Sequence, residues 1–135
     1  MPLASNETAI LNAVVSRLET VTENVLLGYS ATGVQDRDNA PFIMVQLESL
    51  DELGRQGNKA RYQFRFNIST AVKTTDNTTQ ELLIYTCAIR QALDSDERIC
   101  SQARKHSLEE TQFDIAPGHG QLSFADMALT VEAVL

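Results

Sequence analysis

The stretch Lys59–Val72 reads KARYQFRFNISTAV, and its alternation decides the fold class. One parity is mostly apolar and comprises Ala60, Tyr62, Phe64, Phe66, Ile68, Thr70 and Val72. The other parity is mostly polar and comprises Lys59, Arg61, Gln63, Arg65, Asn67, Ser69 and Ala71. Because strand side chains alternate between faces, we expect a strand with an apolar face and a polar face. A sheet with one solvent-exposed polar face is typically antiparallel or mixed. At about 3.3 Å per residue the strand would span about 45 Å, so we expect it to be bent, bulged or extended past its own sheet.

Two segments repeat apolar residues at helical spacing and predict amphipathic helices. The first, starting near Ser5 or Asn6, comprises Ile10, Leu11, Val14, Val15, Leu18 and Val21. The second, over about 77–93, comprises Leu82, Leu83, Tyr85, Thr86, Ile89, Ala92 and Leu93. We expect the apolar face of the long strand to pack on one or both helices.

Four further segments predict strands. They are 25–29, the apolar run 42–47 after Pro41, 108–116 with Thr111, Phe113 and Ile115 inward, and 122–135 with regular alternation. Pro117–Gly120 forms a turn between the last two. The order is therefore α-β-β-β-α-β-β, which predicts one α+β domain over 1–135. Its single mixed or antiparallel sheet has about four or five strands, with both helices packed on it.

The connection 48–58 reads ESLDELGRQGN, and we expect a long projecting hairpin loop there. Long loops tend to be functional or mobile. Leu50 and Leu53 within it either pack back on the sheet or meet a partner.

Composition favours a folded core, with 43% hydrophobic and 21% charged residues among 135. The net charge is −7, and the one positive stripe comprises Lys59, Arg61 and Arg65. Three cations are too few for tight nucleic-acid binding, which neutralises about six to ten phosphates. The stripe is either a solvated surface or the contact to an acidic neighbour. The sequence has neither a membrane-spanning run nor a signal-peptide pattern at its N-terminus, so we expect synthesis in the cytoplasm.

The sequence carries no recognisable catalytic motif, and we expect no enzyme activity, cofactor or metal. Cys87 and Cys100 are expected to be buried, reduced thiols. His106, in a polar connection, and His119 are expected to be solvated. Asp36 and Asp38 have the spacing that begins some calcium loops, but the later Gly and Glu are missing, which favours a solvated turn.

The order of elements, with PFIMVQL, ARYQFRFNISTAV and the final ADMALTVEAVL, resembles the tail terminator (tail-completion) proteins of long-tailed bacteriophages. The resemblance covers nearly the whole chain and is one of pattern rather than of a diagnostic motif. It implies a structural virion protein, in the tail or neck, that is assembled in the bacterial host cytoplasm. Such proteins form hexameric rings that cap the tail tube, stop its polymerisation and join the tail to the head connector.

The implied partners are further copies of the chain, the tail tube protein, the head–tail connector or head-completion protein, and the sheath protein if the tail is contractile. DNA passes through the ring without specific binding, and no membrane is involved. The candidate interface residues are Leu50, Asp51, Glu52, Leu53, Arg55, Lys59, Arg61 and Arg65.

Two other classes remain open at this point. The first class is another adaptor protein of the phage neck or connector. The other is a small α+β ligand-binding protein or enzyme, which requires an apolar cavity with convergent polar groups. Its candidate polar groups, Tyr62, His106 and His119, are scattered over three elements.

Overall fold

The computed structural model describes residues 6–27, 40–93 and 98–135. The elements are α1 (Asn6–Leu18), β1 (Val25–Leu27), β2 (Phe42–Gln56), β3 (Lys59–Lys73), α2 (Thr78–Leu93), β4 (Ala103–Leu108), β5 (Gln112–Asp114) and β6 (Leu122–Val134). The strands form one six-stranded sheet in the order β1-β2-β3-β6-β4, with β5 also paired to β6. β1 is parallel to β2 and the other pairs are antiparallel. The predicted α+β class and mixed sheet are confirmed, with six strands instead of four or five.

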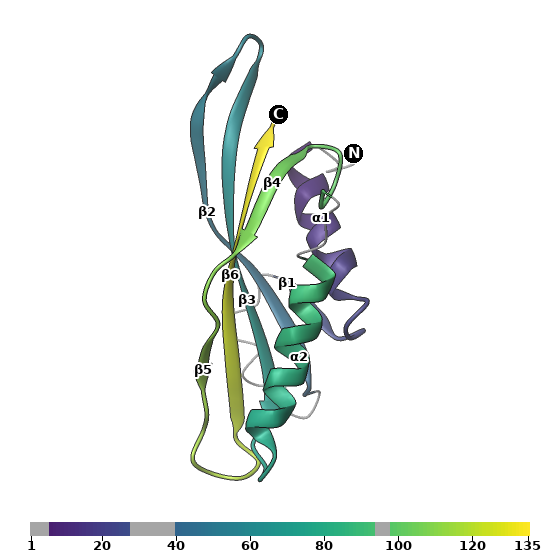
Figure 1. Ribbon diagram of the computed structural model, residues 1–135, viewed down its shortest axis with the longest axis vertical. Helices are drawn as coiled ribbons and strands as arrows, with labels where there is room; N and C mark the ends of the chain where they lie inside the picture. Colours follow the sequence, from purple (N-terminus) through teal and green to yellow (C-terminus); the bar gives the residue numbers. More distant parts are fainter. Residues whose placement is uncertain (1–5, 28–39, 94–97) are drawn as a thin grey trace.

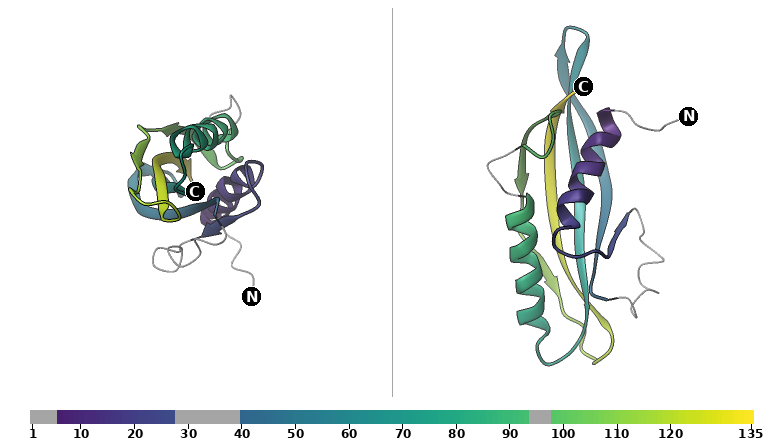
Figure 2. Two further views of the ribbon diagram at one scale, coloured as in Figure 1. Left: turned by 90° about the horizontal axis from the view of Figure 1, so that it is seen from below. Right: turned by 90° about the vertical axis from the view of Figure 1, so that its right-hand side faces the viewer.

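The long strand β3 is central, and both helices lie on its apolar face (Figures 1 and 2). Phe64, Phe66 and Ile68 are buried in one cluster that also contains residues of both helices. The helical members are Ile10, Val14 and Leu18 of α1 and Ile89 and Leu93 of α2. Fully burying a side chain of this size contributes about 1.5–3 kcal/mol. The predicted packing of the apolar face on the helices is therefore confirmed.

The predicted loop over 48–58 is wrong, because β2 continues as a strand to Gln56 and pairs with β3 throughout. Register shifts between Leu47 and Ser49 and between Glu52 and Gly54 mark two β-bulges. Each bulge inserts one residue and shifts the alternation by one, so the sequence loses its period of two. A two-residue turn at Gly57 and Asn58 closes the hairpin. The φ of Gly57 is 64°, as the first turn position of a type II′ hairpin requires.

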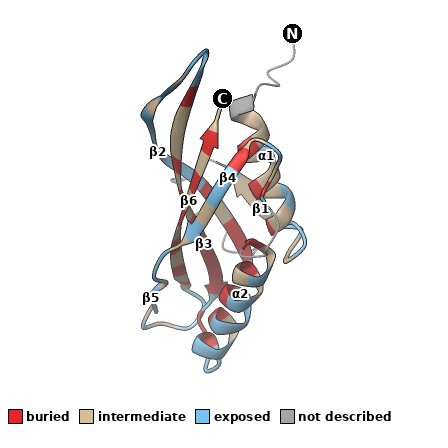
Figure 3. Cartoon of the chain, turned by 45° about the horizontal axis from the view of Figure 1, so that its top comes forward, coloured by how far each residue is buried: buried red, intermediate tan, exposed pale blue. Residues whose placement is uncertain are grey.

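The tip of the β2–β3 hairpin projects beyond the rest of the sheet. β6 pairs with β3 only as far as Arg61, and the backbone of Leu135 bonds that of Ala60. In Figure 1 the hairpin extends past the C-terminus, and in Figure 3 it is largely exposed, whereas the helix-covered strands are red. Leu50 and Leu53 on it are 45% and 40% exposed, so neither packs into the core.

The edge beside β6 also differs from the prediction. Residues 103–108 form β4, so His106 lies on a strand and not in a polar connection. Only Gln112–Asp114 of the predicted strand 108–116 forms a separate strand, β5, while Leu108 ends β4. β4 and β5 follow one another along the same edge of β6. Phe113 and Ile115, expected inward, are each 43% exposed. Phe113 lies on β5, a short edge strand whose three residues are all exposed, and Ile115 follows that strand.

The predicted element bounds agree with the structure in part, and the predicted burial of the cysteines does not. α2 and β6 have the predicted extents within two residues, whereas α1 ends at Leu18. Of the predicted strand 25–29, Val25–Leu27 form β1, and residues 28–29 lie outside the described residues. Both thiols are free, but Cys87 is exposed on α2 and Cys100 is half-buried, so the expectation of two buried thiols is wrong. The candidate calcium residues Asp36 and Asp38 lie outside the described residues. In the part of the chain that the structure describes, no helix has the length and apolarity needed to span a membrane.

Candidate interaction surface

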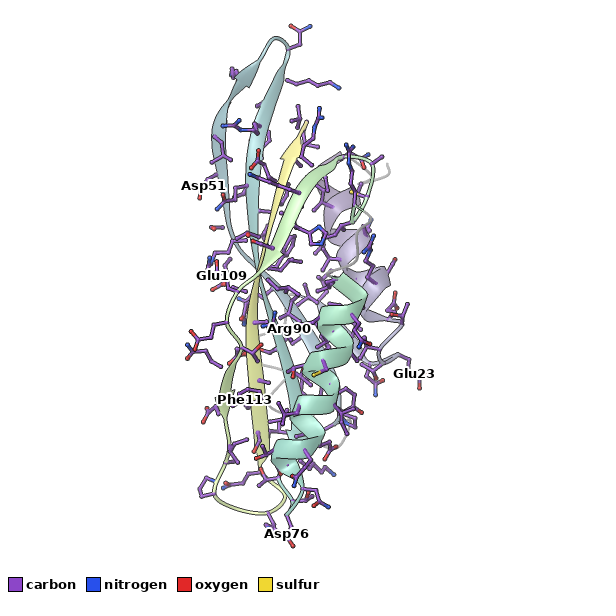
Figure 4. All side chains as sticks on the ribbon, viewed as in Figure 1. Glu23, Asp51, Asp76, Arg90, Glu109 and Phe113 are labelled. Carbon is purple, nitrogen blue, oxygen red and sulfur yellow. The ribbon has the colours of Figure 1, made fainter. Side chains whose placement is uncertain are left out.

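All eight candidate interface residues lie on the β2–β3 hairpin. Leu50, Asp51, Glu52 and Leu53 are exposed on β2. Figure 4 shows Asp51 pointing away from the sheet at the β2 edge. Arg55 Nε lies 3.3 Å from Glu52 Oε1, and 70% of the Arg55 side chain is exposed. The hairpin thus groups acidic and apolar side chains on one exposed strand.

Arg65 on β3 joins a charged cluster on the polar face of the sheet, the face that also carries Arg61 and Gln63. Its Nη1 donates to Glu109 Oε1 at 2.8 Å, and its Nη2 donates to Glu109 Oε2 at 3.3 Å. Arg65 Nε lies 3.8 Å from Glu48 Oε1. The hydrogen bond that Arg65 donates to Glu109 raises the pKa of Arg65 most, and the negative charges of Glu109 and Glu48 raise it further. The paired guanidinium therefore stays charged at every physiological pH.

Arg61 belongs to a second cluster further along the polar face. Its Nε lies 3.5 Å from Glu132 Oε1, and Lys105 Nζ on β4 lies 3.5 Å from Glu132 Oε2. Both contacts are too long for strong hydrogen bonds and act mainly as charge pairs. Arg61 and Arg65 thus have acidic neighbours within their own chain, which the sequence alone does not indicate.

Three further residues, Lys105, Glu109 and Glu132, belong to this surface and were not among the residues predicted from the sequence. They lie far from Arg61 and Arg65 in the sequence and meet them only through the register of β3, β6 and β4. Arg90 of α2 adds a backbone restraint, because its Nη2 donates to the carbonyl oxygen of Glu109 at 2.8 Å. The chain is thereby held where β4 ends, a point that Figure 4 labels at Glu109.

An open depression of about 230 Å³ lies beside Arg65 on the polar face. Its lining is mostly polar and includes Glu48, Asn67, Glu109, Glu110, Gln112 and Asp126. Asp126 accepts a hydrogen bond from Ser69 within the sheet. A small-molecule site normally has an apolar, enclosed lining with few polar groups, and this depression has the opposite character.

The scattered polar groups of the ligand-binding alternative do not converge. Tyr62 packs against the core cluster, His106 lies on β4, and His119 Nε2 lies 3.2 Å from Asp76 Oδ1. Asp76 lies at the end of the molecule furthest from the hairpin tip (Figure 4). Among the described residues, no group of three or more His, Cys, Asp or Glu could hold a metal ion.

The fold is similar to that of a chain in a solved structure described as the virion of a native gene transfer agent particle. The TM-score is 0.55, and the match covers 94% of this chain and 98% of that chain. The two sequences are 11% identical, so the likeness concerns the fold. No family model matches the chain, and no curated protein matches it either.

The edge of β2 carries an apolar stripe beside the charged clusters. Leu47 and Leu50 are each 45% exposed, and Leu53 is 40% exposed. Leu47 and Leu50 pair with Phe66 and Phe64 of β3, whose own side chains are buried on the apolar face. The stripe therefore continues the apolar face of the sheet past the region that the helices cover, which is typical of a surface that meets another protein.

Proposed function

We propose that this protein is a structural component of a phage-like virion that forms a ring, hexameric in its complete form, at the end of the tail tube. The ring caps the tube, stops its polymerisation and joins the tail to the head connector. The observation that carries this proposal is the likeness of fold, over nearly the full length of both chains, to a chain of the gene transfer agent virion. The pattern resemblance to tail terminators supports it independently.

The shape and charge of the sheet support a ring assembly. A ring needs head-to-tail contacts between two different surfaces of each copy. The projecting β2–β3 hairpin offers one such surface and the charged polar face another. The candidate residues Leu50, Asp51, Glu52, Leu53, Arg55, Lys59, Arg61 and Arg65 lie on the hairpin and serve as contacts to further copies or to the tube protein. A net charge of −7 also suits a channel through which DNA slides without sticking, because phosphates are repelled by an acidic lining.

Under this proposal the partners are further copies, the tail tube protein, the head-completion protein and, in a contractile tail, the sheath protein. The role is structural and requires no cofactor or catalysis. A neck or connector adaptor is the second candidate, because the fold likeness is to a virion chain in general. The polar lining of the depression beside Arg65 argues against a small-ligand role.

Light scattering after gel filtration, with negative-stain microscopy, tests the ring directly. We expect a ring for the purified chain, either alone or with tube protein, and a strict monomer under both conditions would contradict the proposal. Charge reversal by Arg61→Glu with Arg65→Glu is expected to weaken the ring. Because both arginines also pair with acids of their own chain, far-ultraviolet circular dichroism of the variant checks that the monomer remains folded. An unchanged ring would exclude these two residues from the interface.

A further inference from the structure

The two edges of the sheet differ in charge. β1 covers β2 only at Ile43–Val45, and no other described strand pairs with the edge of β2. Within that open edge, Glu48, Asp51 and Glu52 are exposed. At the opposite edge, Arg104 and Lys105 of β4 are exposed, and no described strand pairs with β4 besides β6. One edge is therefore acidic and the other is basic.

The two edges are also level with each other. Tracing the register from β4 through β6 and β3 to β2 joins Lys105 to Asp51, His106 to Leu50, Ser107 to Ser49 and Leu108 to Leu47. Along both edges the residues alternate between the same two faces of the sheet. On the polar face, the acidic Asp51 would lie opposite the basic Lys105, and Ser49 would lie opposite Ser107. On the apolar face, Leu50 would lie opposite His106 and Leu47 opposite Leu108, and both of these β4 residues are half-buried.

Strand direction is compatible with pairing between copies. β2, β3, β6 and β4 are successively antiparallel, so β4 runs antiparallel to β2 within one chain. Rotation of a copy about an axis along the strands keeps these directions. The β4 edge of one copy then meets the β2 edge of the next as an antiparallel pair.

The irregularities of the two strands delimit the contact. In β2 the bulges leave Ser49–Glu52 as a regular stretch, and in β4 an irregularity between Ala103 and Lys105 leaves Lys105–Leu108 regular. Bulges and charges are devices that keep an edge strand from pairing indiscriminately. The regular stretches Ser49–Glu52 and Lys105–Leu108 lie at the same level of the sheet.

We propose that the β2 edge of one copy pairs with the β4 edge of a second copy of this chain, with Asp51 beside Lys105 and Leu50 beside His106. This is an interface built from two different edges, and its repetition around an axis closes a ring. Main-chain hydrogen bonds between the edges supply affinity, and the charged row fixes the partner and the register. The inference rests on the self-association in the proposed function and specifies its contact.

Disulfide trapping tests the pairing. In a background with Cys87→Ser and Cys100→Ala, one variant carries Leu50→Cys and a second carries His106→Cys. Within one chain these positions are separated by two intervening strands, about 14 Å at about 4.8 Å per strand spacing. A disulfide needs Cα atoms within about 7 Å, so a link between them joins two copies.

We expect a covalent dimer when the two variants are mixed and oxidised, and little dimer from either variant alone. The matched control replaces His106→Cys by Ile84→Cys, an α2 position that is 69% exposed and away from both edges. Dimer from Leu50→Cys alone at equal yield would indicate symmetric pairing of two β2 edges and would overturn the inference. Absence of the mixed dimer, although light scattering detects an oligomer, would also overturn it.

A charge swap gives a second readout. Asp51→Lys is expected to raise the dissociation constant of the oligomer by about tenfold or more, because two lysines would then face each other. Combining it with Lys105→Asp is expected to restore most of the affinity. The control Asp114→Lys, an exposed acid on β5, is expected to leave assembly unchanged. A lack of rescue by the swap in a chain that does assemble overturns the inference alone. A chain that stays monomeric throughout overturns the inference together with the proposed ring.

Discussion

Arg65 of β3 and Glu109, the residue after β4, form a bidentate ion pair across the intervening strand β6. The Nη1–Oε1 distance is 2.8 Å and the Nη2–Oε2 distance is 3.3 Å. Glu109 is also bonded through its backbone, since its N–H donates to Ala128 of β6 and its carbonyl accepts from Arg90. The pair therefore fixes the point at which the chain leaves β4 and turns toward β5. It also pairs one of the three positive charges of the β3 stripe within the chain.

The coupling between Arg65 and Glu109 should depend on salt. Both side chains are partly exposed, at 39% and 47%, so mobile ions screen the pair. In a double-mutant cycle with Arg65→Met and Glu109→Gln, we expect a favourable coupling at about 0.05 M salt that shrinks toward zero at about 1 M. The matched control is Glu52 with Arg55, whose cycle should show weaker coupling because Arg55 is 70% exposed. A coupling that is independent of salt would contradict this account of the pair.

The core beneath β3 is the main source of stability. Phe66 is fully buried in the cluster shared with both helices, so Phe66→Ala should reduce the free energy of unfolding by about 3–5 kcal/mol. The control Ile84→Ala removes a side chain that is 69% exposed, and it should change the free energy of unfolding by less than about 0.5 kcal/mol. Urea unfolding followed by circular dichroism measures both. Equal effects would mean that the apolar face does not form the core.

The hairpin turn depends on backbone conformation at one glycine. Gly57 has a φ of 64°, a conformation that residues with a Cβ rarely adopt, and no atom of the described residues beyond its two chain neighbours lies within 4 Å of an added Cβ. A methyl group there would therefore strain the backbone without clashing with a neighbouring residue. Gly57→Ala should therefore destabilise the hairpin by about 1–2 kcal/mol. Gly54→Ala is the matched control, because Gly54 has equally open space and no positive φ. Amide exchange at the tip should accelerate only in Gly57→Ala, and equal exchange in the two variants would exclude the turn assignment.

Tyr85 should make stability fall in alkaline solution. Burial raises the pKa of its hydroxyl, and the nearby Glu81 raises it further. In the unfolded chain the same hydroxyl ionises at about 10, so above that pH the folded state binds more protons than the unfolded state. This contribution to stability is complete below about pH 10 and is lost as the pH rises through the folded-state pKa. Tyr85→Phe should flatten the alkaline decline of the unfolding midpoint, and an identical decline in both proteins would contradict it.

The central strand and both helices could be predicted from the sequence because each has a period that burial enforces. The alternation of the sequence is kept where Phe64, Phe66 and Ile68 are buried in the cluster that both helices share. The second half of β2 could not be predicted in this way. Its bulges at Glu48 and Leu53 interrupt the period, and its exposed edge tolerates charges that resemble those of a loop.

The candidate surface was only partly predictable for a different reason. Leu50 could be chosen as an interface candidate because it is an apolar residue in a charged connection, and Arg65 because it belongs to the positive stripe. Their neighbours Lys105 and Glu132 come from other strands, and only the register of the sheet brings them alongside. Phe113 was assigned inward from alternation alone, which cannot distinguish a core strand from a short edge strand.

The most direct measurement of the central claim is the length of tails assembled with and without this protein. Electron microscopy of particles from the native gene cluster, and from the same cluster lacking this gene, gives the distribution of tail lengths. Without the protein we predict tails of irregular, extended length that do not join heads, and restoration of uniform length when the gene is supplied in trans. Tails of normal, uniform length that are joined to heads in its absence would contradict the claim.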